Sequence, residues 1–83
     1  PILTGESANV YATARDNIRY LFMLPDEKKI VELKGVKKLK RVYLMRTGKD
    51  LNYSFKNDCI KINIEDTLHV SSLDVIKVEL LNK

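Results

Sequence analysis

Residues 42–64 carry the feature that most constrains the fold, three short runs in which apolar and polar side chains alternate. Two polar segments separate these runs, residues 46–50 and 56–58, and both have the length and composition of hairpin loops. A period of two places alternate side chains on one face of a strand. The pattern therefore predicts a three-stranded antiparallel meander. Its expected core residues are Val42, Leu44, Leu51, Tyr53, Phe55, Ile60, Ile62 and Ile64.

The stretch Ile18–Leu24 is apolar on both of its faces. One face carries Ile18, Tyr20, Phe22 and Leu24, and the other carries Arg19, Leu21 and Met23. A strand of this kind is usually covered on both sides. In a chain of 83 residues, the second cover would be another sheet or a neighbouring domain.

Short strand-like runs recur along the whole chain with polar turns between them, whereas no window keeps a helical period. The predicted strands are residues 10–14, 18–24, 29–33, 42–45, 51–55, 60–64 and 74–81. Residues 1–9 are predicted to be a lead-in strand or a linker remnant, and residues 65–72 a loop. The spacing predicts an all-β fold, a small antiparallel β-sandwich of about seven strands in one domain over residues 1–83. An OB-like or SH3-like barrel would produce similar runs and stays an alternative.

Several classes of chemistry are disfavoured by the composition. One cysteine, Cys59, and one histidine, His69, cannot form an internal disulfide or a cysteine-based zinc cluster, so we expect no metal and no cofactor. The acidic residues fall mostly in predicted turns, where Asp is favoured for backbone reasons. We therefore expect no catalytic residue in this chain. No apolar run reaches about 18 residues, so no membrane span is expected.

Charge is distributed unevenly around the net value of +4. Residues 28–49, here called the basic band, hold nine basic residues against the single acid Glu32, a net charge of +8, and the rest of the chain carries −4. Such a band is a possible docking surface for a glycan or an acidic protein. Nucleic acid is a third, less favoured partner, because Tyr53, which would have to stack on bases, is expected in the core. Tyr11 and Tyr43 are the rings expected to point outward.

Residues 11–81 resemble the C-terminal β-sandwich domain of family 29 glycoside hydrolases, the α-L-fucosidases. The resemblance rests on four segments in the same order as in that family. They are YATARDNIRYLFMLP (residues 11–25), KLKRVYLMRTGKDLNYSF (residues 38–55), CIKINI (residues 59–64) and VIKVEL (residues 75–80).

The resemblance implies that fucosidase activity would belong to a (β/α)₈ barrel upstream of Pro1. The present chain would be a non-catalytic accessory domain that packs on this barrel and stabilises it, in a periplasmic or secreted enzyme. Its partner would be the upstream catalytic domain of the same chain, with carbohydrate as a further partner. The start at Pro1 rather than at Met fits a piece of a larger protein.

The expected interdomain or binding surface consists of outward apolar residues and of lysines from the basic band. The alternative hypothesis is a stand-alone module that binds a glycan or a protein through the basic band. The candidate surface residues are Leu21, Met23, Arg41, Tyr43, Met45, Lys37, Lys38 and Lys40. Leu21 and Met23 would leave this surface if a second sheet covered them.

Overall fold

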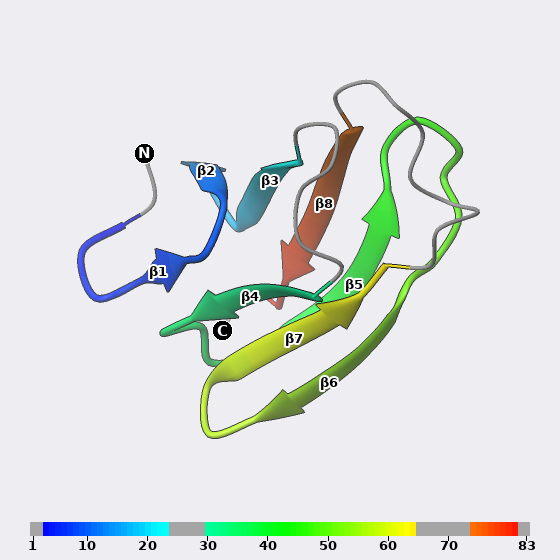
Figure 1. The fold of residues 1–83 in the computed structure, drawn as a ribbon. Coiled ribbons are helices and arrows are strands. Elements are labelled where there is room, and N and C mark those ends of the chain that lie inside the picture. The colour runs from blue at the N-terminus through cyan, green and yellow to red at the C-terminus, as the bar shows by residue number, and fades with distance from the viewer. Residues whose placement is uncertain (1–2, 24–29, 65–73, 82–83) are drawn as a thin grey trace.

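The computed structural model describes residues 3–23, 30–64 and 74–81, which form two antiparallel sheets of four strands packed together (Figure 1). Sheet A has the strand order β1-β4-β7-β6, and sheet B has the order β2-β3-β8-β5. The strands are β1 (Ser7–Ala8), β2 (Tyr11–Arg15), β3 (Ile18–Met23), β4 (Ile30–Lys34), β5 (Leu39–Leu44), β6 (Asn52–Lys56), β7 (Cys59–Asn63) and β8 (Asp74–Leu80). The predicted all-β antiparallel sandwich is confirmed, and the additional strand is the short β1. The predicted loop at residues 65–72 lies outside the described residues.

Turn chemistry explains why the hairpins close where they do. In the two-residue loop between β6 and β7, Asn57 and Asp58 have positive φ values of 54° and 60°. A type I′ turn needs positive φ at both central residues, and Asn and Asp tolerate this conformation better than most other side chains. In the turn between β2 and β3, Asp16 has a φ of 54°. The local sequence thus determines both hairpins.

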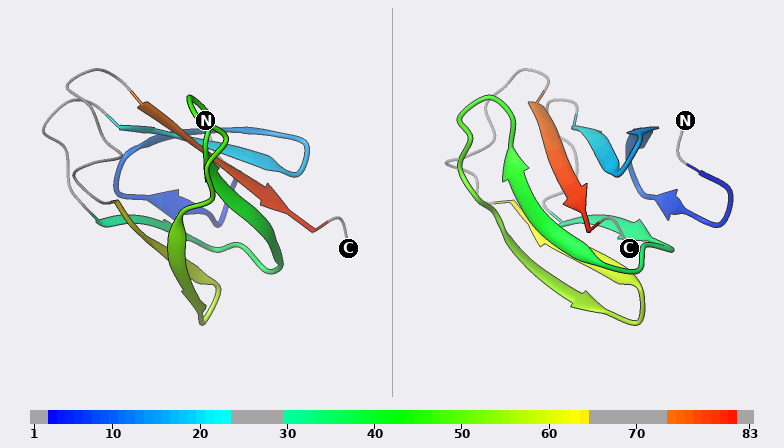
Figure 2. Two further views of the ribbon diagram at one scale, coloured as in Figure 1. Left: turned by 90° about the vertical axis from the view of Figure 1, so that its right-hand side faces the viewer. Right: turned by 180° about the vertical axis from the view of Figure 1, so that it is seen from behind.

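Residues 42–64 do not form the predicted three-stranded meander. β5 pairs with β8 at one edge of sheet B, whereas β6 and β7 form a hairpin in sheet A. The chain crosses from one sheet to the other between β5 and β6, as both views in Figure 2 show. One isolated bridge, Tyr43 to Asp50, accompanies the crossing. Alternation specifies which face of a strand is buried, but it does not specify which strand pairs with which.

The core lies between the two sheets and is made of aliphatic side chains from both. Leu21 and Met23 are fully buried in it, so sheet A covers one face of the doubly apolar stretch, whereas the other face points outward from sheet B. The predicted placement of these two residues on an outer surface is therefore wrong. The outward side chains of β3 are Ile18, Tyr20 and Phe22. The largest fully buried side chains are Leu21, Met23, Leu33, Leu44, Ile60, Ile62 and Ile76.

The predicted core contribution of Tyr53 and Phe55 is also wrong. Their side chains are 46% and 37% exposed, whereas their register partners Ile62 and Ile60 are completely buried. The reason is the position of β6, which is an edge strand of sheet A with β7 as its only neighbour in the sheet. An edge strand lies at the margin of the contact between the sheets, so apolar alternation does not ensure burial there.

Candidate functional site

The outward side chains of sheet B form a surface that we call the aromatic face. Residues that oppose each other in the strand register lie on the same side of a sheet, so the register arranges these side chains in rows across β2, β3, β8 and β5. The first row is Tyr11, Phe22 and Val75; the second is Thr13, Tyr20, Lys77 and Tyr43; the third is Arg15, Ile18, Glu79 and Arg41.

Tyr43 is the centre of a polar cluster at the β5 edge of the aromatic face. The guanidinium carbon of Arg41 lies 4.0 Å from the Tyr43 ring centroid, and the Lys77 ammonium nitrogen lies 5.7 Å from it. Cations over an aromatic face are attracted by its quadrupole. The Tyr43 hydroxyl donates a hydrogen bond of 2.9 Å to Glu79 Oε2. The two cations and the carboxylate therefore hold the ring in a defined orientation.

Two pKa shifts follow from the contacts of this cluster. The hydrogen bond from Arg41 Nε to Asp50 Oδ1, 2.6 Å long, is the main cause that raises the pKa of Arg41 above its ordinary value. The hydrogen bond between Lys77 and Tyr43 is the main cause that raises the pKa of Lys77. Both side chains therefore remain cationic throughout the physiological pH range.

Apolar and aromatic side chains dominate the first row of the aromatic face, whereas the polar cluster lies in the second and third rows. The rings of Tyr11 and Phe22 lie 5.5 Å apart, centroid to centroid, in a tilted arrangement. Tyr11 is 68% exposed, and Met45 is 50% exposed. The Met45 amide donates a 2.9 Å hydrogen bond to the carbonyl oxygen of Val75, which places Met45 beside the first row. Exposed apolar side chains grouped in this way make this part of the face a candidate interaction surface.

The structure brings some predicted surface residues together and separates others. Arg41, Tyr43 and Met45 share the β5 side of the aromatic face. Leu21 and Met23 point in the opposite direction, into the core, and cannot contribute to any surface.

The predicted lysines lie away from the aromatic rings. Lys37 and Lys38, in the loop that connects β4 to β5, line a depression of about 360 Å³ together with Leu80 and Leu81. Lys37 is also paired with Asp58, at 2.7 Å. Lys40 is exposed on β5, at the bulge between Leu39 and Arg41.

Tyr20, Phe22 and Lys77 were not among the predicted surface residues. The signal that identifies them is the period of two in β3 and β8, once the inner face of each strand is known. For β3 the two faces are similarly apolar, so the sequence alone does not decide between them. The buried position of Leu21 settles the choice.

The described residues contain no group of three or more side chains that could hold a metal ion. Cys59 is a free, partly buried thiol on sheet A, and His69 lies outside the described residues. In the part of the chain that the structure describes, no helix is long and apolar enough to cross a membrane.

Comparison of the chain with protein-family models, with curated proteins and with solved structures finds no match. The resemblance to the α-L-fucosidase domain therefore stays a prediction.

Proposed function

We propose that this chain is the non-catalytic C-terminal accessory domain of an α-L-fucosidase-like glycoside hydrolase, and that it packs on an upstream catalytic barrel and stabilises it. The observation that carries the proposal is the aromatic face. One outer face of an antiparallel sandwich is ordinarily polar when it faces water. Here Tyr11 and Met45 are half-exposed or more, beside Phe22 and Val75. Interdomain surfaces within a chain have this moderately apolar character.

The polar cluster around Tyr43 gives this surface a second component. Arg41 and Lys77 present two cations, and Glu79 presents one carboxylate that is already bonded to the Tyr43 hydroxyl. Arg and Tyr are enriched in protein interfaces because both bury large areas and still satisfy polar groups at the rim. An apolar end and a charged end on one sheet match a neighbouring domain better than they match a small ligand.

The alternative, a stand-alone module that binds through the basic band, receives less support from the contacts. Among the described residues, four cations of the band form ion pairs within the domain: Lys34 with Glu32, Lys37 with Asp58, Arg41 with Asp50 and Arg46 with Asp74. Each pair lowers the positive potential that the band presents to an anionic partner. Binding to an acidic protein that is weakened by reversing Lys37, Lys38 and Lys40 to Glu would favour this alternative.

The first test of the proposal is the sequence encoded before Pro1, where we expect a (β/α)₈ pattern. The purified 83-residue chain is then incubated with an aryl α-L-fucoside, and we expect no turnover. Turnover that survives replacement of the acids of this chain would overturn the proposal. An upstream region without a barrel pattern would overturn it as well.

The docking role of the aromatic face has a separate test with a matched control. We expect Tyr11→Ser and Met45→Ser to lower the melting temperature of the longer protein while they leave that of the 83-residue chain nearly unchanged. Ile30→Ser is the control, because Ile30 is 51% exposed on the outer face of sheet A. Equal effects of all three substitutions in both proteins would contradict docking through sheet B.

A further inference from the structure

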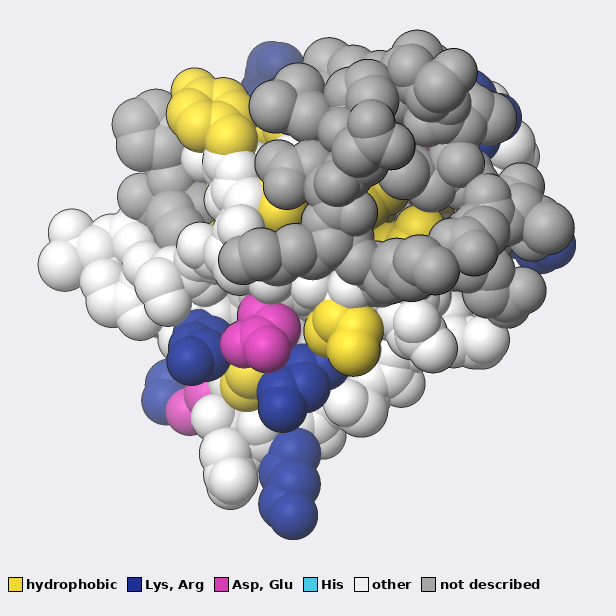
Figure 3. All heavy atoms as spheres, in the orientation of Figure 1, with side chains coloured by type: hydrophobic (Ala, Val, Ile, Leu, Met, Phe, Trp, Pro, Cys, Tyr) yellow, Lys and Arg dark blue, Asp and Glu magenta, His cyan; other side chains and the backbone are white. Residues whose placement is uncertain are grey.

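The outer face of sheet A differs in composition from the aromatic face. Apart from Ile30 and Cys59, its outward positions on the strands carry polar or charged side chains, and none carries an aromatic ring. By register they form the rows Ser7, Lys34, Cys59 and Lys56; Glu32, Lys61 and Ser54; and Ile30, Asn63 and Asn52. Figure 3 shows basic side chains gathered with acidic ones in the lower part of the molecule, where Figure 1 places β4, β7 and β6.

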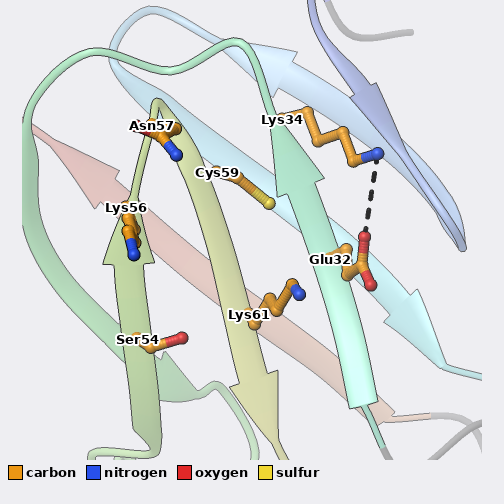
Figure 4. Close-up of a pocket in the computed structure, with 7 residues that line it drawn as sticks. All are labelled: Glu32, Lys34, Ser54, Lys56, Asn57, Cys59 and Lys61. Atoms are coloured by element: carbon orange, nitrogen blue, oxygen red, sulfur yellow. Dashed lines mark ion pairs between the residues drawn. The ribbon is translucent and has the colours of Figure 1, made fainter.

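Three lysines from three different strands, Lys34, Lys56 and Lys61, form what we call the lysine cluster. They line a depression of about 520 Å³, together with Glu32, Ser54, Asn57 and Cys59. Figure 4 shows these side chains on β4, β6, β7 and the turn between β6 and β7. A volume of this size is within the range of ordinary small-ligand sites, which is about 300–1,000 Å³.

The strand register brings like charges together in the lysine cluster. Lys34 and Lys56 both oppose Cys59, one from each side, and Lys61 follows two residues along β7. Among the outward positions of β4, β6 and β7 there is one acid, Glu32, and its Oε1 lies 4.0 Å from Lys34 Nζ. The three lysines and this one acid give the outward positions of β4, β6 and β7 a net charge of +2, which attracts anions. The arrangement therefore favours a ligand that carries negative charge.

A second depression continues the first and defines the shape of the ligand. It has a volume of about 340 Å³ and shares Ser54 and Lys61 with the first depression. Its other lining residues are Ile30, Asn52, Tyr53 and Asn63. The shared residues place the two depressions next to each other across β4, β7 and β6, and we call the two together the trough. Amide and hydroxyl side chains in the second part can both donate and accept hydrogen bonds, as sugar hydroxyls require.

Single-stranded nucleic acid fits this trough less well than an acidic glycan does. Proteins that bind single strands stack the bases on exposed aromatic rings beside a cationic groove. Tyr53, which is 46% exposed, is the one aromatic side chain among the residues that line the trough, and Tyr11, Tyr20 and Phe22 lie on the opposite sheet. Glu32, which lines the first depression, can accept a hydrogen bond from a sugar hydroxyl.

We propose that the outer face of sheet A binds an anionic oligosaccharide, with the lysine cluster holding a carboxylate or sulfate group and Asn52, Ser54 and Asn63 holding hydroxyls of the adjoining sugar. This inference does not depend on the accessory-domain role, because the aromatic face belongs to the other sheet. It also differs from binding through the basic band, since Lys56 and Lys61 lie outside residues 28–49.

The test follows backbone amide shifts of the ¹⁵N-labelled 83-residue chain by NMR during titration at low salt. The probes are tetragalacturonate for the carboxylate source, a heparin-derived tetrasaccharide for the sulfate source, and maltotetraose as the neutral control. We expect saturable shifts at β4, β6 and β7 with at least one of the two acidic probes, which identifies the anionic group, and none with the neutral control. Raising the salt concentration should weaken the binding, because the lysines are exposed and screened by ions.

Two variants with the same loss of charge make the test specific. The variant Lys34→Gln/Lys56→Gln/Lys61→Gln should bind the acidic probe at least about tenfold more weakly, since it loses the charge-assisted hydrogen bonds to the anion. The control variant is Lys38→Gln/Lys40→Gln/Lys49→Gln, which also removes three positive charges but leaves the trough intact; its affinity should fall by less than about threefold.

Three results would overturn the proposal. They are the absence of saturable shifts with both acidic probes, an equal loss of affinity in the two variants, and tighter binding of a single-stranded oligonucleotide of the same charge.

Discussion

Arg19 and Glu6 form a bidentate ion pair that is buried in the sandwich. Arg19 Nε lies 2.8 Å from Glu6 Oε1, Nη2 lies 2.9 Å from Oε2, and the two side chains are only 4% and 8% exposed. Arg19 Nη1 also donates to the carbonyl oxygens of Asp16 and Ile18. Glu6 directly precedes β1, at the edge of sheet A, and Arg19 lies on β3 in sheet B. The ion pair therefore links the two sheets.

Removing one partner of this pair should destabilise the fold strongly. We expect Glu6→Gln to lower the free energy of unfolding by about 3 kcal/mol, because Arg19 would be left as an uncompensated buried charge. The partly exposed pair between Glu32 and Lys34 is the control, and Glu32→Gln should cost less than about 1 kcal/mol. Urea unfolding followed by circular dichroism measures both values. A double variant with Glu6→Leu and Arg19→Met should be more stable than Glu6→Gln. Equal stability of Glu6→Gln and Glu32→Gln would contradict the structural role.

Gly35 is required by two independent features of its position. Its φ is +87°, and a Cβ atom added there would collide with the carbonyl oxygen of Gly5. Gly48 has a φ of +73° with open space around it, so Gly48→Ala experiences the backbone strain alone. We expect Gly48→Ala to cost about 1 kcal/mol and Gly35→Ala about 3 kcal/mol. Thermal unfolding distinguishes the two, since 1 kcal/mol shifts the midpoint of a small domain by about 4–8 °C. Similar midpoints for both variants would show that the Gly5 carbonyl oxygen does not prevent a Cβ atom from being accommodated at position 35.

The hydrogen bond between Lys77 and Tyr43 should be visible as a pH dependence in the alkaline range. The folded-state pKa of Lys77 is raised above its ordinary value of 10.5, so the linked stabilisation is complete below that value and is lost as the pH rises through the folded-state pKa. The ¹³Cε shift of Lys77 should titrate with a midpoint above 10.5. Tyr43→Phe should move this midpoint downward, because it removes the main cause of the shift. A midpoint that is unchanged in Tyr43→Phe would exclude the hydroxyl as its source.

Tyr53 and Ile62 offer a direct measure of how an edge strand contributes to the core. They oppose each other across β6 and β7, but Ile62 is completely buried and Tyr53 is 46% exposed. We expect Ile62→Ala to destabilise the domain by about 3 kcal/mol and Tyr53→Ala by about 1 kcal/mol, since less area is lost from the core and no closed cavity remains. Chemical denaturation compares the two. A larger loss for Tyr53→Ala would mean that its ring is buried in solution.

Much of the fold could be predicted from local patterns. The alternation at Ile60, Ile62 and Ile64 correctly identified a strand with one buried face, and the Asn57-Asp58 pair correctly marked its hairpin. The partner of each strand could not be predicted, because pairing depends on contacts between residues distant in sequence. For this reason β5 was expected beside β6 and is found beside β8.

The candidate surfaces show the same division between local and distant information. Arg41, Tyr43 and Met45 were identified as outward from the alternation around them, and the structure places them together. On β3, Leu21 and Met23 were predicted to lie on the surface, although the structure buries both. The side chains that alternate with them are equally apolar, so the pattern could not distinguish the two faces of this strand. The lysine cluster was not identified, since its members are spread from residue 34 to residue 61 and meet only through the register of three strands.

The sequence by itself determined that this protein is an antiparallel β domain, where most of its strands lie and how its hairpins turn. These properties depend on side-chain period and on the φ preferences of single residues, which act over a few positions. The tertiary structure alone decided the division into two sheets, the burial of Arg19 with Glu6 and the composition of the two outer faces. These features arise from packing between segments far apart in the chain, where the burial of one face of a strand fixes the exposure of the other.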